Sequence, residues 1–242
     1  KDSKLSAPKN SNLKTVMDFS FFDKINTAKN EQTETWFKGL DRIYNNFVYD
    51  FLYPNPASVL AFIENHDTDR FLGEGNNLPM LKQASTLLLT TRRIPQLYYG
   101  TEVMMNGVKS KSDGYVRKDF PGGWTGDATN ALTPAGRTKI QNECYDFYKT
   151  ILNWRKGNDV IAKGSMVQFM VQNGVYAYAR QYEGKTIFVM LNGTDAETTV
   201  PLKFYKEILK DSKQGKDILS GKAITFGEEL KMGPRESLVI EL

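Results

Sequence analysis

The chain has 242 residues, of which 40% are hydrophobic and 25% are charged, a composition typical of a globular protein with a sizeable core. A single cysteine and a single histidine exclude an intrachain disulfide and any metal site built from several cysteines or histidines. The net charge of +4 is evenly spread and no apolar run approaches the ~20 residues of a membrane span, so we expect neither a nucleic-acid partner nor a membrane partner.

Residues 1–157 predict alternating strands and helices. Short apolar runs at residues 14–19, 58–63 and 94–99 predict strands. A helix over residues 78–92 is expected between the last two. Between the first two strands, apolar residues recur at spacings of three and four, which predicts another helix: Trp36, Leu40, Ile43, Phe47 and Phe51. This alternation predicts an α/β domain of parallel strands with right-handed crossovers.

A long polar loop over residues 100–130 leads to the last helix of this domain. Loops of that length in compact domains are usually functional or disordered. We expect the helix to begin with Thr133 as its N-cap and Pro134 as its first residue, and to end near Gly157. Short apolar runs between turn residues follow, which predicts an antiparallel domain over residues 158–242.

The densest polar cluster follows the second predicted strand, over residues 62–70. His66 and Asp67 are neighbours there, which disfavours a Ser-His-Asp triad. A sugar-binding use fits better, with His66 donating to one substrate hydroxyl and Asp67 accepting from two others. The spacing alone leaves open a structural use, in which His66 caps a turn and Asp67 pairs with Arg70.

Three segments carry a resemblance to a known family. Residues 62–67, Phe-Ile-Glu-Asn-His-Asp, resemble the fourth conserved region of the α-amylase superfamily (glycoside hydrolase family 13), and residues 94–102 resemble its eighth barrel strand. Residues 113–117 and 120–124 are similar to a stretch of neopullulanases and cyclomaltodextrinases. The resemblance implies strands 6–8, the C-terminal portion of a (β/α)8 TIM barrel, followed by an antiparallel β-sandwich domain.

The resemblance also implies roles for individual residues. Asp67 would stabilise the transition state, and His66 would bind hydroxyls of the sugar being cleaved. Asp113 and Arg117 would hold the next sugar, unless they form only a loop salt bridge. Further substrate contacts are expected from four residues of the same loops, although packing alone would explain each aromatic one: Asn65, Arg70, Tyr99 and Trp124.

The nucleophile and the general acid of this family lie in motifs resembling Arg-x-Asp and Glu-x-Trp at the ends of strands four and five. We find no equivalent of these two catalytic motifs in the chain. The Glu-x-Trp at Glu34 follows the predicted strand six, so it is interpreted as coincidence. The chain is therefore expected to be the C-terminal part of an enzyme, inactive alone and partnered by the missing N-terminal part. By itself it should expose a strand edge and the inner barrel face, and therefore aggregate or require its N-terminal part.

The leading hypothesis is a segment of a retaining α-glucan hydrolase that cleaves α-1,4 bonds in starch, pullulan, cyclodextrin or maltooligosaccharides, with α-1,6 bonds left open. One alternative is a non-catalytic carbohydrate-binding protein of the same fold, and another is an unrelated small α/β domain with an appended sandwich. No cofactor or metal is expected here, although the absent part could hold calcium, and a homo-oligomer stays open. Related enzymes suggest a periplasmic or secreted location, with a cytoplasmic one as the alternative.

Cys144 is expected to be buried, and Lys109 and Lys111 to be solvated loop charges.

Overall fold

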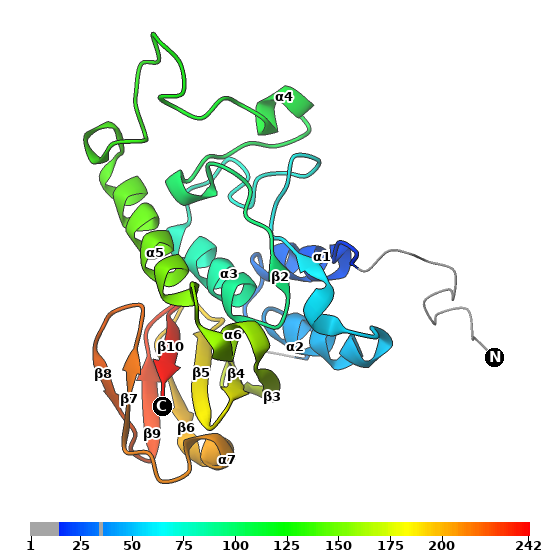
Figure 1. Cartoon of the computed structure of the whole chain (residues 1–242), viewed down its shortest axis with the longest axis vertical. Coiled ribbons are helices and arrows are strands. Elements are labelled where there is room, and N and C mark those ends of the chain that lie inside the picture. The colour runs from blue at the N-terminus through cyan, green and yellow to red at the C-terminus, as the bar shows by residue number, and fades with distance from the viewer. Residues whose placement is uncertain (1–14, 34–35) are drawn as a thin grey trace, which may run out of the picture.

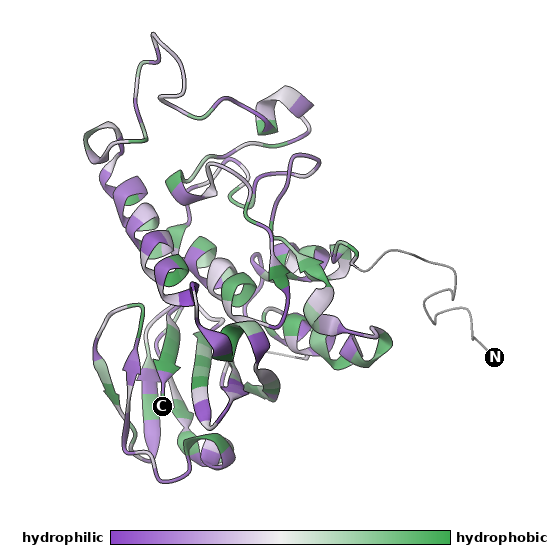
Figure 2. Cartoon of the chain, in the orientation of Figure 1, coloured by the Kyte–Doolittle hydropathy of each residue, from purple (hydrophilic) through white to green (hydrophobic). Residues whose placement is uncertain are grey.

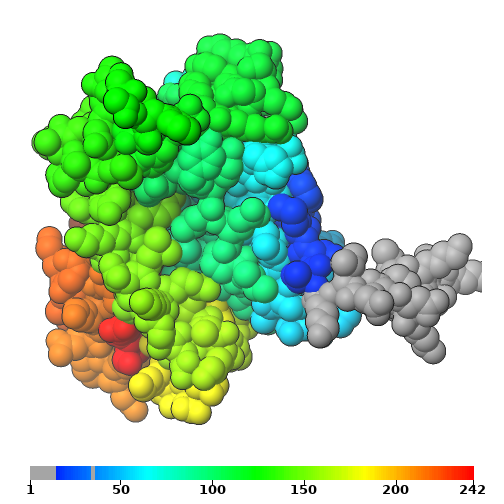
Figure 3. Space-filling model, turned by 45° about the horizontal axis from the view of Figure 1, so that its top comes forward, coloured from blue at the N-terminus to red at the C-terminus, as the bar shows by residue number. Residues whose placement is uncertain are grey.

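The computed structural model describes residues 15–33 and 36–242. Helices and short parallel strands form the first part of the chain, and an antiparallel sandwich forms the second (Figure 1). The long loops of residues 100–138 gather at the end of the molecule that is remote from the sandwich (Figure 3, green against yellow to red). Within the described residues, no helix is both long enough and apolar enough to cross a membrane.

Three parallel segments lie side by side in the first part. Strand β1 (Leu60–Ala61) pairs with β2 (Ile94–Pro95), and Met17 forms a parallel bridge to Leu60 on the other side. Buried residues directly follow β1, as expected for a strand covered on both faces: Phe62 and Ile63. The segments thus form an arc with the order Met17, β1, β2.

The first predicted strand is wrong in extent, because helix α1 (Phe19–Ala28) begins inside it. The Asp18 carboxylate accepts a hydrogen bond from the Phe21 amide at 2.8 Å and caps that helix. Val16 and Met17 are exposed, and only a bridge is left of the strand.

The helix predicted between Trp36 and Phe51 is also shorter than expected. Helix α2 covers Asp41–Val48, followed by a 3-10 helix over Tyr49–Leu52. Gly39 has a φ of +55°, outside the helical region, and the Leu40 amide donates to the Thr33 hydroxyl at 2.9 Å. Trp36 therefore lies before the helix and is 68% exposed. Glu34, whose Glu-x-Trp match was interpreted as coincidence, lies outside the described residues.

Two longer helices cover the arc and lead to the sandwich. Helix α3 (Leu78–Thr90) is capped by Asn77 and is close to the predicted range. Helix α5 (Lys139–Arg155) starts at Thr138 rather than at Thr133, because Thr138 and Gln141 form a reciprocal capping box. Pro134 lies instead in a 3-10 turn over Pro134–Gly136.

We expect Thr138→Ala to lower the free energy of unfolding by about 1 kcal/mol, because it removes the N-cap acceptor of α5. The matched control is Thr133→Ala, since the Thr133 hydroxyl donates to the Asn130 carbonyl and accepts from no helix amide. Denaturant unfolding of both variants measures the difference. Equal losses would contradict the assignment of Thr138 as the cap.

The sandwich has a six-stranded sheet with the order β3-β4-β5-β10-β7-β8 and a two-stranded sheet, β6-β9. Its elements are α6 (Asp159–Lys163), β3 (Ser165–Gln172), β4 (Val175–Tyr182), β5 (Lys185–Asn192), β6 (Thr198–Pro201), α7 (Lys206–Leu209), β7 (Gln214–Asp217), β8 (Ala223–Thr225), β9 (Glu229–Met232) and β10 (Ser237–Glu241). Every pairing in it is antiparallel, as expected.

The two faces of the large sheet belong to different cores because strand side chains alternate. One face, including Tyr178 and Val189, packs with the helices of the first part, and the other, including Phe188, packs inside the sandwich. Figure 2 shows apolar residues on the upper parts of β5 and β10, on the side of the sheet toward the helices of the first part. Arg180 donates to the Thr90 carbonyl at 2.9 Å from a fully buried position, and burial lowers its pKa to about 10. One continuous core therefore joins both parts, and the division between residues 157 and 158 stays a prediction.

Candidate functional site

His66 and Asp67 lie where the chain leaves the buried strand β1. Glu64 and Asn65 are buried, whereas the side chains of His66 and Asp67 are 58% and 57% exposed. The Asn65 side-chain oxygen accepts from the Asp67 amide at 2.8 Å, and the Thr68 hydroxyl accepts from the Asn65 amide at 3.0 Å. This turn places the imidazole and the carboxylate together, with Nε2 of His66 3.2 Å from Oδ2 of Asp67.

The Asp113–Arg117 segment meets this pair. Helix α4 (Asp113–Val116) is a single turn, so Asp113 and Arg117 project from the same side of the loop. Nη2 of Arg117 lies 3.0 Å from Oδ1 of Asp67 and 3.4 Å from Oδ2 of Asp113, and its Nε donates to the His66 carbonyl at 2.8 Å. Two segments 50 residues apart in sequence thus form one polar cluster of His66, Asp67, Asp113 and Arg117.

Arg70 does not belong to this cluster, contrary to the prediction of a substrate contact. Its guanidinium is buried and contacts the Glu64 carboxylate at 3.3 Å, and it donates to the Tyr99 carbonyl at 2.6 Å and the Val116 carbonyl at 3.1 Å. The structural alternative, an Asp67–Arg70 pair, is equally wrong, because Arg117 pairs with Asp67. Burial raises the pKa of Glu64, while its contacts with Thr101, Phe71 and Arg70 oppose that rise.

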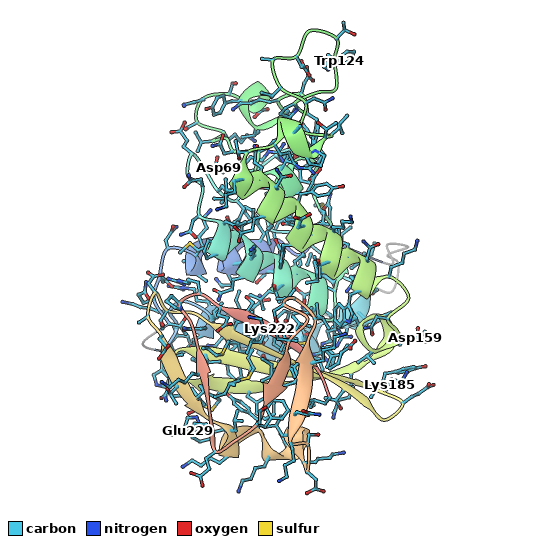
Figure 4. All side chains as sticks on the ribbon, turned by 90° about the vertical axis from the view of Figure 1, so that its left-hand side faces the viewer. Asp69, Trp124, Asp159, Lys185, Lys222 and Glu229 are labelled. Carbon is cyan, nitrogen blue, oxygen red and sulfur yellow. The ribbon has the colours of Figure 1, made fainter. Side chains whose placement is uncertain are left out.

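The other three predicted substrate residues have different positions. Asn65 is only 2% exposed, and its side chain shapes the turn rather than facing a ligand, which corrects the expectation. Tyr99 is 38% exposed, and its hydroxyl donates to the Lys118 carbonyl at 2.6 Å. Trp124 is 68% exposed near the far tip of the loops (Figure 4). A substrate role for Tyr99 or Trp124 stays a prediction.

Lys109 and Cys144 were assigned no role in the site. Cys144 is fully buried, which confirms the expectation, and burial raises the pKa of its thiol to about 12. Lys109 differs from the expectation of a solvated charge, because its ammonium donates to the Asp67 carbonyl at 3.0 Å. In the described ranges, no group of three or more His, Cys, Asp or Glu side chains is arranged to hold a metal ion.

Comparison with known proteins shows which family the chain resembles. Residues 166–241 match the family model of the cyclo-malto-dextrinase C-terminal domain. An α-amylase of Niallia circulans is 28% identical over 88% of this chain and 37% of its own length. A cyclomaltodextrin glucanotransferase of Thermoanaerobacterium thermosulfurigenes is 30% identical over 84% of this chain and 27% of its own length. These matches confirm the predicted resemblance to the α-amylase superfamily, glycoside hydrolase family 13.

Solved structures show the same fold. An Anoxybacillus α-amylase matches with a TM-score of 0.75 and 20% identity over 95% of this chain and 47% of its own. An α-amylase from Geobacillus thermoleovorans, solved with acarbose, matches with a TM-score of 0.74 and 21% identity over 95% of this chain and 48% of its own. The Met17 segment, β1 and β2 are thus the predicted strands 6–8 of a (β/α)8 barrel, followed by the sandwich. The chain spans 37% and 27% of the lengths of these two curated relatives and about half of these solved chains.

Proposed function

We propose that the complete protein is a retaining α-glucan hydrolase that cleaves α-1,4 bonds in starch, pullulan, cyclodextrin or maltooligosaccharides. The observation that carries the proposal is the cluster at the end of β1. There, Nη2 of Arg117 lies 3.0 Å from Oδ1 of Asp67 and 3.4 Å from Oδ2 of Asp113. Carboxylates and a guanidinium with free hydrogen-bonding capacity suit the hydroxyl groups of a sugar.

The bond-breaking carboxylates would come from the part of the enzyme outside this chain. In a retaining glycosidase, a nucleophilic carboxylate and an acid lie about 5 Å apart. The nucleophile bonds to the anomeric carbon as the glycosidic bond breaks, and the acid gives its proton to the leaving oxygen. The acid residue, now deprotonated, then takes a proton from a water molecule. The water oxygen bonds to the anomeric carbon as the bond between that carbon and the nucleophile breaks.

Asp67 and His66 would act on the sugar that reacts. Asp67 would accept hydrogen bonds from two hydroxyls, and these bonds strengthen as the ring flattens toward the oxocarbenium-like transition state. Stronger binding of that state than of the ground state raises kcat. His66 would donate to a third hydroxyl, and Arg117 would hold the Asp67 carboxylate in place from the other side.

The test is whether the full-length protein releases reducing sugar from soluble starch and maltoheptaose. We expect NMR to detect the α-anomer as the first product, since two displacements at the anomeric carbon retain its configuration, and residues 1–242 alone to release none. A protein that binds maltoheptaose without cleaving it would support the non-catalytic alternative, and a β-anomer as first product would contradict the retaining mechanism.

A further inference from the structure

The loop that carries Lys109 is fixed against the loop that carries Asp67. The Lys109 amide donates to the Asp69 carboxylate at 2.6 Å, and two backbone hydrogen bonds of Gly107 continue this contact on its N-terminal side. At the other end of the residue, the ammonium group donates to the Asp67 carbonyl at 3.0 Å. Lys109 is therefore held by both its backbone and its side chain, unlike a solvated loop lysine.

The same ammonium group helps to surround the Asp113 carboxylate. Nζ of Lys109 lies 3.5 Å from Oδ1 of Asp113, and Nη2 of Arg117 lies 3.4 Å from Oδ2. Each carboxylate oxygen thus has its own cation, and the two cations come from opposite ends of the loop segment. An acceptor held in one orientation before binding loses less conformational entropy when a ligand hydroxyl arrives.

We infer that Lys109 is a positioning residue that orients Asp113 for the sugar adjoining the one cleaved. This inference rests on the proposed function, because it assigns a substrate to the Asp113–Arg117 pair. Lys109 need not touch the sugar. Since Lys109 and Asp113 are about half exposed, water screens their attraction, and we expect a moderate effect on binding rather than a loss of catalysis.

Lys111 is a matched control two residues away on the same loop. Its side chain is 50% exposed, against 45% for Lys109. Its ammonium contacts the Glu74 carboxylate and lies over the Tyr115 ring, 4.6 Å from the ring centre. These contacts do not involve any residue of the polar cluster. Lys109→Ala and Lys111→Ala therefore remove the same charge from the same loop with different local consequences.

The experiment measures kcat and KM of the full-length enzyme on maltoheptaose. We expect Lys109→Ala to raise KM about three- to tenfold with kcat within about twofold, and Lys109→Arg to restore most of the affinity. Lys111→Ala should match the wild type. An unchanged KM for Lys109→Ala, or a lower kcat without a change in KM, would overturn the inference. A wild-type enzyme that cleaves no glucan would instead overturn the proposed function.

A double-mutant cycle separates positioning of Asp113 from a general effect on the loop. In an Asp113→Asn background, the neutral amide no longer attracts the ammonium, so Lys109→Ala should change KM by less than about twofold. A change as large as in the wild-type background would show that Lys109 acts elsewhere and would overturn the inference.

Discussion

Asp67→Asn in the full-length enzyme is expected to lower kcat by about a thousandfold or more on maltoheptaose. The amide keeps the shape of the side chain, but it loses the negative charge and one of the two acceptor oxygens that would stabilise the oxocarbenium-like transition state. The 3.0 Å contact with Arg117 is also weakened, because only a carboxylate pairs as a charge with the guanidinium. Initial rates over a range of substrate concentrations separate kcat from KM.

Asp69→Asn is the control for this substitution. Asp69 is also an exposed carboxylate of the same loop. It accepts a hydrogen bond from the Lys109 amide, and the side-chain oxygen of an asparagine can still accept that bond. We expect kcat to stay within about threefold of the wild type. A near-normal kcat in Asp67→Asn would refute the role proposed for Asp67.

Arg70→Met is expected to lower the free energy of unfolding by about 3–5 kcal/mol, because it leaves the Glu64 carboxylate buried without its cation. The variant also loses the contacts that Arg70 makes with the Tyr99 and Val116 carbonyls. Without Arg70, Glu64 folds more readily as the neutral acid. The loss should therefore be smaller at low pH, where Glu64 is neutral in both proteins, and should grow as the pH rises above the folded-state pKa of Glu64 in the wild type, which burial raises above its ordinary value. Thermal or denaturant unfolding of the full-length protein at two pH values measures the loss.

Lys163→Met provides the comparison for an exposed ion pair. Lys163 lies 3.1 Å from Asp159 on α6, and both side chains are 56% exposed. Water and salt screen such a pair, so we expect no resolvable change in the free energy of unfolding. Equal losses in Arg70→Met and Lys163→Met would contradict the structural role assigned to Arg70.

Local signals in the sequence predicted several features well. The apolar run at residues 58–63 is followed by polar residues, which indicated a polar site at the end of a strand. A buried strand leaves the core where its side chains become polar. Turn residues between short apolar runs indicated an antiparallel domain, and at the turn between β4 and β5 both Glu183 and Gly184 adopt positive φ angles, 48° and 78°. Such patterns depend on neighbouring residues, so they can be detected without knowledge of the fold.

Apolar periodicity was a weaker guide where the chain turns. Trp36 and Phe51 continued the spacing of the helix at residues 41–48, yet both are exposed outside it. The spacing records which residues are apolar, but the left-handed Gly39 and the hydrogen bond from Leu40 to Thr33 determine where the helix begins.

The amino-acid sequence alone predicts the order of strands and helices, the antiparallel second domain and the polar residues at the end of β1. It does not predict which arginine pairs with which carboxylate, because that depends on the tertiary structure. Arg70 follows Asp67 by three residues, yet it is buried against Glu64, whereas Arg117 reaches Asp67 from a loop 50 residues away. The physical reason is that charged partners are selected by proximity and burial in three dimensions, and these depend on how distant loops pack.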